Sequence, residues 1–198
     1  MSTNPYSTYD CLSLVFKLEK VLGDVAEEEL QMFSYLSCLL SLYDGKSLAF
    51  WNYSFIKTTL GAPFSSTLME AVKYLLDIGS LNSEGGYLRI TDFGKSQLEI
   101  LMDLDLNLNR EKYLDAAVKC IEYSPYSVVK EALFKEPILH DSFGLDSRKT
   151  LIDKEDFSLG QLYDQFNHLH NALQGKYSDH LVVPAMTWLS FLINHQIG

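Results

Sequence analysis

The chain has 198 residues, of which 47% are hydrophobic and 21% charged, values that suit one domain with a real core or two small domains sharing an interface. Its formal net charge is −10, and both halves are acidic: residues 1–103 hold 7 Lys and Arg against 13 Asp and Glu, and residues 104–198 hold 9 against 13. Proteins that grip a phosphate backbone usually carry a basic stripe, so this balance argues against stand-alone nucleic-acid binding but leaves room for a local basic patch.

Two apolar helical stretches open the chain. Residues 9–22 carry apolar side chains at helical spacing and end before Gly23. Asp24 is the predicted N-cap of the next helix, because Glu27 stands three residues on, as in a capping box. That helix runs to a stop at Asp44-Gly45 and is apolar nearly all round, which is typical of a buried central helix or of one that docks a second surface.

A break follows, and then an amphipathic helix. The apolar stretch 47–60 ends at the Gly-Ala-Pro of residues 61–63. The next helix is predicted to begin near Ser65–Thr67, with Thr67 and Glu70 at capping-box spacing, and to end at Gly79 as a left-handed cap. Its apolar positions form a stripe at i, i+3, i+4, i+7 and i+8.

A short two-stranded ribbon is predicted directly after this helix. Residues 80–82 and 87–90 flank a Gly-Gly turn, which is typical of a β-hairpin. Thr91 is the predicted N-cap of a further helix that reaches to about residue 103.

This order of helix, break, helix, ribbon and helix resembles the winged-helix family over residues 24–103. The stretches that carry the resemblance are the helix STLMEAVKYLLDIGSL, the turn NSEGG, the strand YLRI and the closing TDFGKSQLEIL, with its Thr-x-x-Gly. The resemblance implies that the first helix of the pair braces the second. It also implies that the ribbon covers the open end of a three-helix core by burying Leu81, Leu88 and Ile90.

Residues 104–198 are predicted to form a helical C-terminal region. DLDLNLN, after Asp103, suggests a linker or an irregular helix end, because Asp and Asn disfavour a strand. Helical patterns resume at 110–123 and 126–136, and residues 138–157 are predicted to be a long loop or mobile excursion.

Two more helices complete this region. Ser158 is the predicted cap of a helix through Leu173, with Gly175 as its end, and Pro184 suits the first turn of the last helix. The predicted fold is therefore mainly α with a small β-hairpin wing. A winged-helix domain with N-terminal helices occupies residues 1–103, and a helical region occupies residues 104–198.

Catalytic and metal-binding motifs do not emerge from the sequence. Gly45-Lys46-Ser47 matches only the end of a Walker loop, and His168 and His170 are two apart on a predicted helix, so they point to different faces. We therefore predict no enzyme, no cofactor and no metal, with a small metal-independent enzyme as a remote third option.

The cysteines and the absence of targeting signals suggest a compartment. Cys11, Cys38 and Cys120 are widely separated in apolar stretches, which indicates buried reduced thiols rather than a disulfide framework. The first ten residues lack the pattern of a signal peptide, and no apolar run is long enough to span a bilayer. The sequence therefore predicts a cytoplasmic protein without a membrane partner.

DNA reading by the winged helix is the alternative function. The second helix of the pair would enter the major groove and the wing would touch the backbone. Yet the helix offers one Lys against two acidic residues, and the wing tip carries Glu84. The residues that could contact DNA are Ser65, Ser66, Thr67, Lys73, Arg89 and Lys95.

Surplus apolar helix surface points instead to a protein partner. LQMFSYLSCLLSLY and AMTWLSFLI are apolar on more than one face, so they are either core or a docking surface. The predicted partner-binding residues are Trp51, Tyr53, Phe55, Trp188 and Phe191.

An acidic winged-helix protein with a helical extension is similar to the accessory subunits of bacterial SMC-type complexes. It also resembles the middle component of three-gene ABC-ATPase defence systems such as the Lamassu type. The resemblance implies a non-catalytic subunit that bridges a coiled-coil SMC/ABC-type ATPase and an effector such as a nuclease, in anti-plasmid or anti-phage defence or chromosome maintenance. It is also compatible with a homodimer, and DNA would be touched only indirectly or weakly. The alternative is a transcriptional regulator, dimeric through Tyr9–Val21 or the C-terminal helix.

Overall fold

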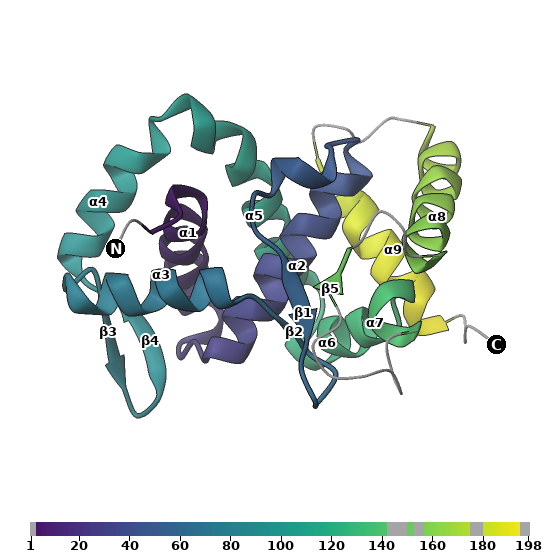
Figure 1. The fold of residues 1–198 in the computed structure, drawn as a ribbon. Helices are drawn as coiled ribbons and strands as arrows, with labels where there is room; N and C mark the ends of the chain where they lie inside the picture. Colours follow the sequence, from purple (N-terminus) through teal and green to yellow (C-terminus); the bar gives the residue numbers. More distant parts are fainter. Residues whose placement is uncertain (1–2, 142–149, 153–156, 175–179, 195–198) are drawn as a thin grey trace.

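The computed structural model describes residues 3–141, 150–152, 157–174 and 180–194, and these are mainly helical with two small antiparallel sheets (Figure 1). This confirms the predicted fold class of α-helices with a small β wing. The helices and strands, in chain order, are α1 (Pro5–Leu22), α2 (Glu27–Tyr43), the 3₁₀ turn η1 (Leu48–Phe50), β1 (Phe55–Lys57), β2 (Pro63–Phe64), α3 (Ser66–Asp77), β3 (Leu81–Glu84), β4 (Tyr87–Ile90), α4 (Asp92–Met102), α5 (Asp105–Tyr123), α6 (Tyr126–Phe134), α7 (Pro137–Asp141), β5 (Thr150–Leu151), α8 (Phe157–Leu173) and α9 (Val182–Asn194).

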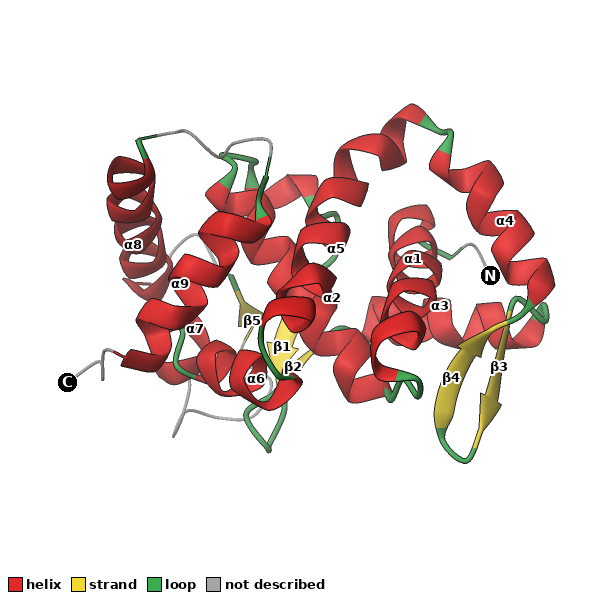
Figure 2. Cartoon of the chain, turned by 180° about the vertical axis from the view of Figure 1, so that it is seen from behind, coloured by secondary structure: helices red, strands yellow, loops and turns green. Residues whose placement is uncertain are grey.

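The elements are arranged along one long direction. Helices α1, α3 and α4 lie with the β3–β4 ribbon at one end, and α6 to α9 lie at the other, as Figures 1 and 2 show from opposite sides. Helices α2 and α5 run between the two ends and pack against each other, and both also pack against α1. Because a single cluster of buried apolar side chains extends through both halves, the junction at residues 103/104 is not a break in the core. The division into a domain of residues 1–103 and a region of residues 104–198 stays a prediction.

The start of α2 differs from the prediction. Its N-cap is Ala26, whose backbone N–H donates to the Glu29 carboxylate at 2.6 Å. Glu29 therefore accepts from a backbone N–H at the helix start, a role that was predicted for Asp24 as the cap. Asp24 instead accepts from Arg89 of the ribbon at 2.7 Å. The predicted cap was wrong because a cap two residues further on competes for the same helix end. The predicted stop is confirmed, since Asp44 is the C-cap of α2.

Helix α3 and the ribbon follow the sequence prediction closely. Ser65 is the N-cap, with its hydroxyl accepting from the Leu68 N–H, so the helix begins slightly before the predicted Thr67 box. Gly79 follows the helix with φ of 76°, the left-handed conformation predicted for it. Gly85 and Gly86 make the turn with φ of 62° and 87°, which only glycine adopts readily at both positions of a two-residue hairpin.

The ribbon covers the apolar core as the winged-helix resemblance implied. Leu81 and Leu88 are buried with 2% or less of their surface exposed, and Ile90 is 7% exposed. A backbone bridge between Val25 and Leu88, with the Leu88 N–H donating to the Val25 carbonyl at 2.8 Å, attaches the ribbon to the α1–α2 connection. The compact unit thus includes α1 as well as the predicted residues 24–103.

A second sheet was not predicted. Strand β1 lies between β2 and β5, with Phe55 opposite Leu151 and Ile56 opposite Phe64. Strands of two or three residues leave too short a pattern to be recognised in a sequence. Phe55 and Leu151 are each 1% exposed, so this sheet joins the 50–64 region to the C-terminal half of the core.

The C-terminal half corrects two predictions. The DLDLNLN stretch is not a linker, since α5 begins at Asp105 and includes most of it. Within 138–157, residues up to 141 belong to α7 and residues 150–151 form β5, so this part is not one long loop. The rest of that range falls mostly outside the described residues, as does Gly175, the predicted end of α8.

Candidate interaction surfaces

Helix α3 presents an acidic face. Its apolar stripe, Leu68, Ala71, Val72 and Leu75, is buried against the core. The exposed side carries Glu70, Lys73 and Asp77, and none of the three has an ion-pair partner among the described residues. In a DNA-reading winged helix this is the side that would enter the major groove, where carboxylates repel phosphate.

Two of the three cations predicted to contact DNA are paired with carboxylates. Arg89 lies on β4 with its guanidinium 2.7 Å from Asp24, and Lys95 on α4 lies 3.0 Å from Asp92. Such exposed pairs contribute little to stability, but each cancels the positive charge that a phosphate would need. On the exposed side of α3 and on the described ribbon, Lys73 is thus the only cation without a partner carboxylate.

The hydroxyl residues at the start of α3 are placed differently from one another. Ser66 is exposed and Thr67 is half-buried, so both lie near the expected DNA-facing position. Ser65 is 1% exposed and its backbone is held by Gln31 of α2, which donates to the Ser65 carbonyl at 3.2 Å and accepts from its N–H at 2.8 Å. Ser65 therefore caps α3 and fixes it to α2.

Thr91 and Gly94 set the angle between the ribbon and α4. The Thr91 hydroxyl donates to the Gly79 carbonyl at 2.8 Å and accepts from the Gly94 N–H at 3.0 Å, which confirms the predicted cap. A Cβ on Gly94 would lie 2.1 Å from the Ser80 carbonyl oxygen, so only glycine fits there. The Thr-x-x-Gly pattern therefore reflects a close contact between backbones.

A buried ion pair joins α1 to α5. Asp10 of α1 and Arg110 of α5 are both fully buried, and the Arg110 Nε donates to Asp10 Oδ1 at 2.8 Å. Tyr53 donates to Asp10 Oδ2 at 2.6 Å, and Arg110 also donates to the Phe50 carbonyl at 3.1 Å. Burial lowers the pKa of Arg110, but the attraction and hydrogen bonds of Asp10 outweigh it, so the net shift is upward and Arg110 stays charged.

Aromatic rings enclose this ion pair. The guanidinium carbon of Arg110 lies 3.9 Å from the centre of the Trp51 ring and 5.1 Å from that of Tyr6, distances typical of cation–π contact. Sequence reasoning missed Asp10 and Arg110. The available signal was a lone carboxylate in the apolar run 9–15, since an acidic residue is seldom fully buried without a partner.

Three of the predicted partner-binding residues have packing roles in this chain. Trp51 and Phe55 are each 1% exposed, and Tyr53 is half-buried with its hydroxyl bonded to Asp10 and Ser34. Together they line one side of a pocket of about 290 Å³ that also contacts Leu151 of β5. The structure thus brings the three together, but it places most of their surface inside the protein.

Trp188 and Phe191 also come together, in an apolar groove between α8 and α9 with a volume of about 320 Å³. Trp188 is 2% exposed and its indole N–H donates to Gln165 at 2.9 Å, so it is held in place. Phe191 is 42% exposed, which makes it the most accessible of the five predicted partner residues. Contact of any of the five with a partner stays a prediction.

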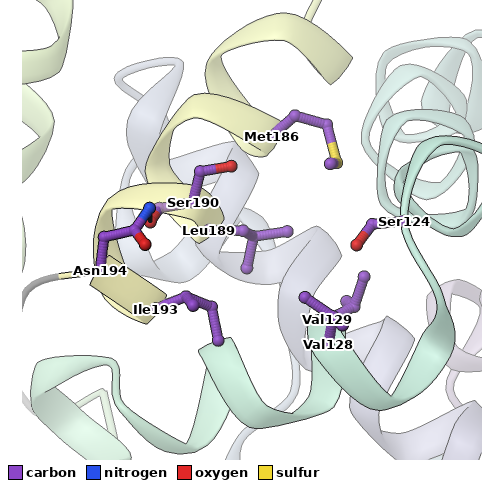
Figure 3. Close-up of a pocket in the computed structure, with 8 residues that line it drawn as sticks. All are labelled: Ser124, Val128, Val129, Met186, Leu189, Ser190, Ile193 and Asn194. Atoms are coloured by element: carbon purple, nitrogen blue, oxygen red, sulfur yellow. Dashed lines mark hydrogen bonds between the residues drawn. The ribbon is translucent and has the colours of Figure 1, made fainter.

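A smaller pocket lies between α6 and α9. Figure 3 shows Val128 and Val129 of α6 facing Leu189 and Ile193 of α9, with Ser124 at one edge. Its volume of about 100 Å³ equals the space of roughly three water molecules. Small-molecule sites are commonly about 300–1,000 Å³, so this pocket is a packing gap between the helices.

The chemically reactive side chains are shielded. All three cysteines are free and buried, and burial raises the pKa of Cys120 to about 12 and those of Cys11 and Cys38 still further. They are therefore protonated at neutral pH, whereas a nucleophilic cysteine needs a thiolate.

Metal-binding and membrane-spanning features give no candidate in the described part of the chain. Those residues contain no group of three or more His, Cys, Asp or Glu that could hold a metal ion. His170 stacks on Tyr43 with ring centres 4.2 Å apart, which gives it a packing role. Crossing a bilayer takes a longer and more apolar helix than any found in residues 3–141, 157–174 and 180–194.

Comparison with known proteins gives no further guide, since no family model, curated protein or solved structure matches the chain.

Proposed function

We propose that this chain acts in the cytoplasm as a non-catalytic winged-helix subunit that joins a coiled-coil SMC/ABC-type ATPase to an effector. Such a complex would serve bacterial defence against plasmids or phage, or chromosome maintenance. The proposal draws on the resemblance of the helix–ribbon–helix stretch and on the acidic character of its exposed face.

The pairing of Arg89 with Asp24 is the observation that carries the proposal. A DNA-reading wing keeps its cations available for phosphate, and counterion release then supplies most of the affinity. Here the wing arginine is neutralised within the chain, and the tip carries the exposed Glu84. A face of this kind is complementary to a protein surface with basic residues rather than to nucleic acid.

If a neighbouring gene encodes a coiled-coil ATPase, its co-expression with this chain tests the proposal. We expect the two proteins to elute together in size-exclusion chromatography, with a light-scattering mass equal to that of a defined complex. A well-behaved monomer that never associates with the ATPase or any other product of its operon would contradict it.

Fluorescence anisotropy with a labelled duplex from the chain's own promoter tests the regulator alternative. At low salt, where phosphate contacts are strongest, we expect no binding. Salt-dependent binding that Lys73→Glu and Arg89→Glu abolish would favour the regulator instead. Lys119→Glu on α5 is the matched control, because Lys119 is also exposed and paired with a carboxylate but lies away from the wing.

A further inference from the structure

An apolar groove lies where α1, α3 and α4 meet, beneath the arch that α4 and the start of α5 form in Figure 1. We call it the arch groove; its volume is about 300 Å³. The residues that define it here are Thr8 and Leu12 of α1, Tyr74 and Ile78 of α3, and Ile100 and Leu101 of α4.

The apolar side chains at this groove are unusually exposed. Ile100 is 69% exposed, and Tyr74 and Ile78 are 38% and 36% exposed. Phe93, seven residues before Ile100 and so on the same side of α4, is 54% exposed. Tyr74, Ile78 and Ile100 line one groove, and exposed apolar side chains gathered in this way are typical of a contact surface.

Carboxylates border the groove. Glu70 and Asp77 lie four residues before and three residues after Tyr74 on α3, and Asp103 lies three residues after Ile100, so each neighbours an exposed apolar side chain. All three are exposed, and none forms an ion pair with a described residue. The groove is therefore apolar at its floor, and the three carboxylates outnumber Lys73, the cation on the same exposed side of α3, so the rim is negative on balance.

This charge pattern selects among the conceivable occupants. A second copy placed symmetrically would bring the same carboxylates of both chains together, in a protein that already carries a net charge of −10. Nucleic acid would meet the same repulsion. A helix with apolar residues at i, i+3, i+4 and i+7 and with Lys or Arg beside them is complementary to both the apolar floor and the carboxylates of the rim.

We propose that the arch groove is the docking site for a cationic amphipathic helix of a partner protein. This inference rests on the proposed role as an interaction subunit and adds the chemistry of the segment that is bound. The apolar face of the helix covers Tyr74, Ile78 and Ile100, and its basic side chains meet Glu70, Asp77 and Asp103.

Two labelled synthetic peptides of about 15 residues test the proposal on the full chain. Both carry Leu at helical spacing; one has Lys and the other Glu at the remaining positions. Fluorescence anisotropy at about 0.15 M salt, where general charge attraction is screened, measures their binding. We expect the Lys peptide to bind at least about tenfold more tightly than the Glu peptide.

Variants separate the groove from the general acidity of the surface. Ile100→Ser should weaken the Lys peptide about tenfold, and Asp77→Lys with Asp103→Lys should weaken the Lys peptide and strengthen the Glu peptide. The controls are Leu60→Ser, at a side chain that is 87% exposed elsewhere, and Glu84→Lys at the wing tip, and both should leave binding unchanged. Circular dichroism confirms that each variant stays folded.

Several results would overturn the inference. Equal binding of the two peptides would remove the charge argument. A loss with Glu84→Lys equal to that with the double variant Asp77→Lys with Asp103→Lys would show only general attraction to an acidic protein. A dimer that Ile100→Ser converts to a monomer would make a second copy the occupant.

The proposed function and the groove assignment can be tested separately. If the ATPase co-elutes with the chain and tolerates Ile100→Ser and the charge reversals, the subunit role stands and the groove assignment fails. If the Lys peptide binds as expected but no operon product associates, the groove chemistry stands and the subunit role fails.

Discussion

Asp10 and Arg110 are 100 residues apart in sequence, yet they form an ion pair in which neither side chain is exposed to solvent. The pair fastens α1, which packs against the β4 strand of the ribbon, to α5, which begins the C-terminal region. Buried charges of this kind specify which helices pack together, because either charge left alone in the core is strongly unfavourable.

Removing one partner should therefore cost more than removing both. Arg110→Met leaves Asp10 buried without a counter-charge, and we expect the free energy of unfolding to fall by about 3–5 kcal/mol. The double variant Asp10→Leu with Arg110→Met should lose less than Arg110→Met alone, because it leaves no buried charge unpaired. Urea unfolding of the four proteins measures the difference, and a loss below about 1 kcal/mol for Arg110→Met would show that the pair is not truly desolvated.

Gly94→Ala should destabilise the protein although alanine is the better helix former. The added methyl group would overlap the Ser80 backbone, which cannot move without disturbing the Thr91 hydrogen bonds, and overpacking typically costs about 1–3 kcal/mol. Gly160→Ala on α8 is the matched control, because a Cβ added to Gly160 would meet no described atom within 4 Å. That variant should gain up to about 1 kcal/mol, and equal thermal shifts for the two would contradict the close contact.

Alkaline pH should unfold the protein cooperatively. Burial raises the pKa of Tyr9, Tyr53, Tyr113 and Tyr126 above the ordinary value of 10.0. Because the folded pKa exceeds the unfolded one, this contribution to stability is fully present below pH 10 and is lost as the pH rises above it. Ionisation of these four tyrosines, followed by absorbance, and loss of circular dichroism should occur together, whereas ionisation of all 12 tyrosines near pH 10 with the helices intact would disprove the burial.

The three thiols should be inert in the native protein. Cys11 and Cys120 are fully buried, Cys38 is 4% exposed, and burial raises the pKa of each. We expect a thiol reagent to label none of them at neutral pH and all three after unfolding in urea. Rapid labelling of one cysteine in the native protein would reveal an opening that exposes its helix.

The fragment 1–103 tests the predicted domain boundary. It lacks α5, which packs against both α1 and α2 and supplies Arg110 to Asp10. We expect the fragment to lose the cooperative thermal transition of the full chain and to regain it when residues 104–198 are co-expressed. A fragment that melts cooperatively at the temperature of the full chain would establish residues 1–103 as an autonomous domain.

The features predicted well from sequence depend on local chemistry. The left-handed Gly79, the Gly85-Gly86 turn and the Thr91 cap each follow from what one or two residues permit. The i, i+3, i+4 stripe likewise identified the buried side of α3.

The features missed depend on contacts between distant residues. Nothing in the sequence links Asp10 with Arg110, or Phe55 of β1 with Leu151 of β5. The arch groove needs three helices in place before Tyr74 and Ile100 are seen to face a common space. The same limit explains why Trp51 was predicted to bind a partner. Its aromatic side chain suggested a contact surface, but in the structure it packs against the buried guanidinium of Arg110.

The hydrogen bond from Leu88 to Val25 has a mechanical consequence. Val25 lies two residues before α2, a helix of 17 residues and about 25 Å that ends at Tyr43, where the ring of His170 from α8 stacks. The hairpin is thus attached near one end of a rigid helix rather than to a flexible loop. Since α8 contacts the other end of that helix, a displacement of the wing would be transmitted through α2 to the C-terminal helices.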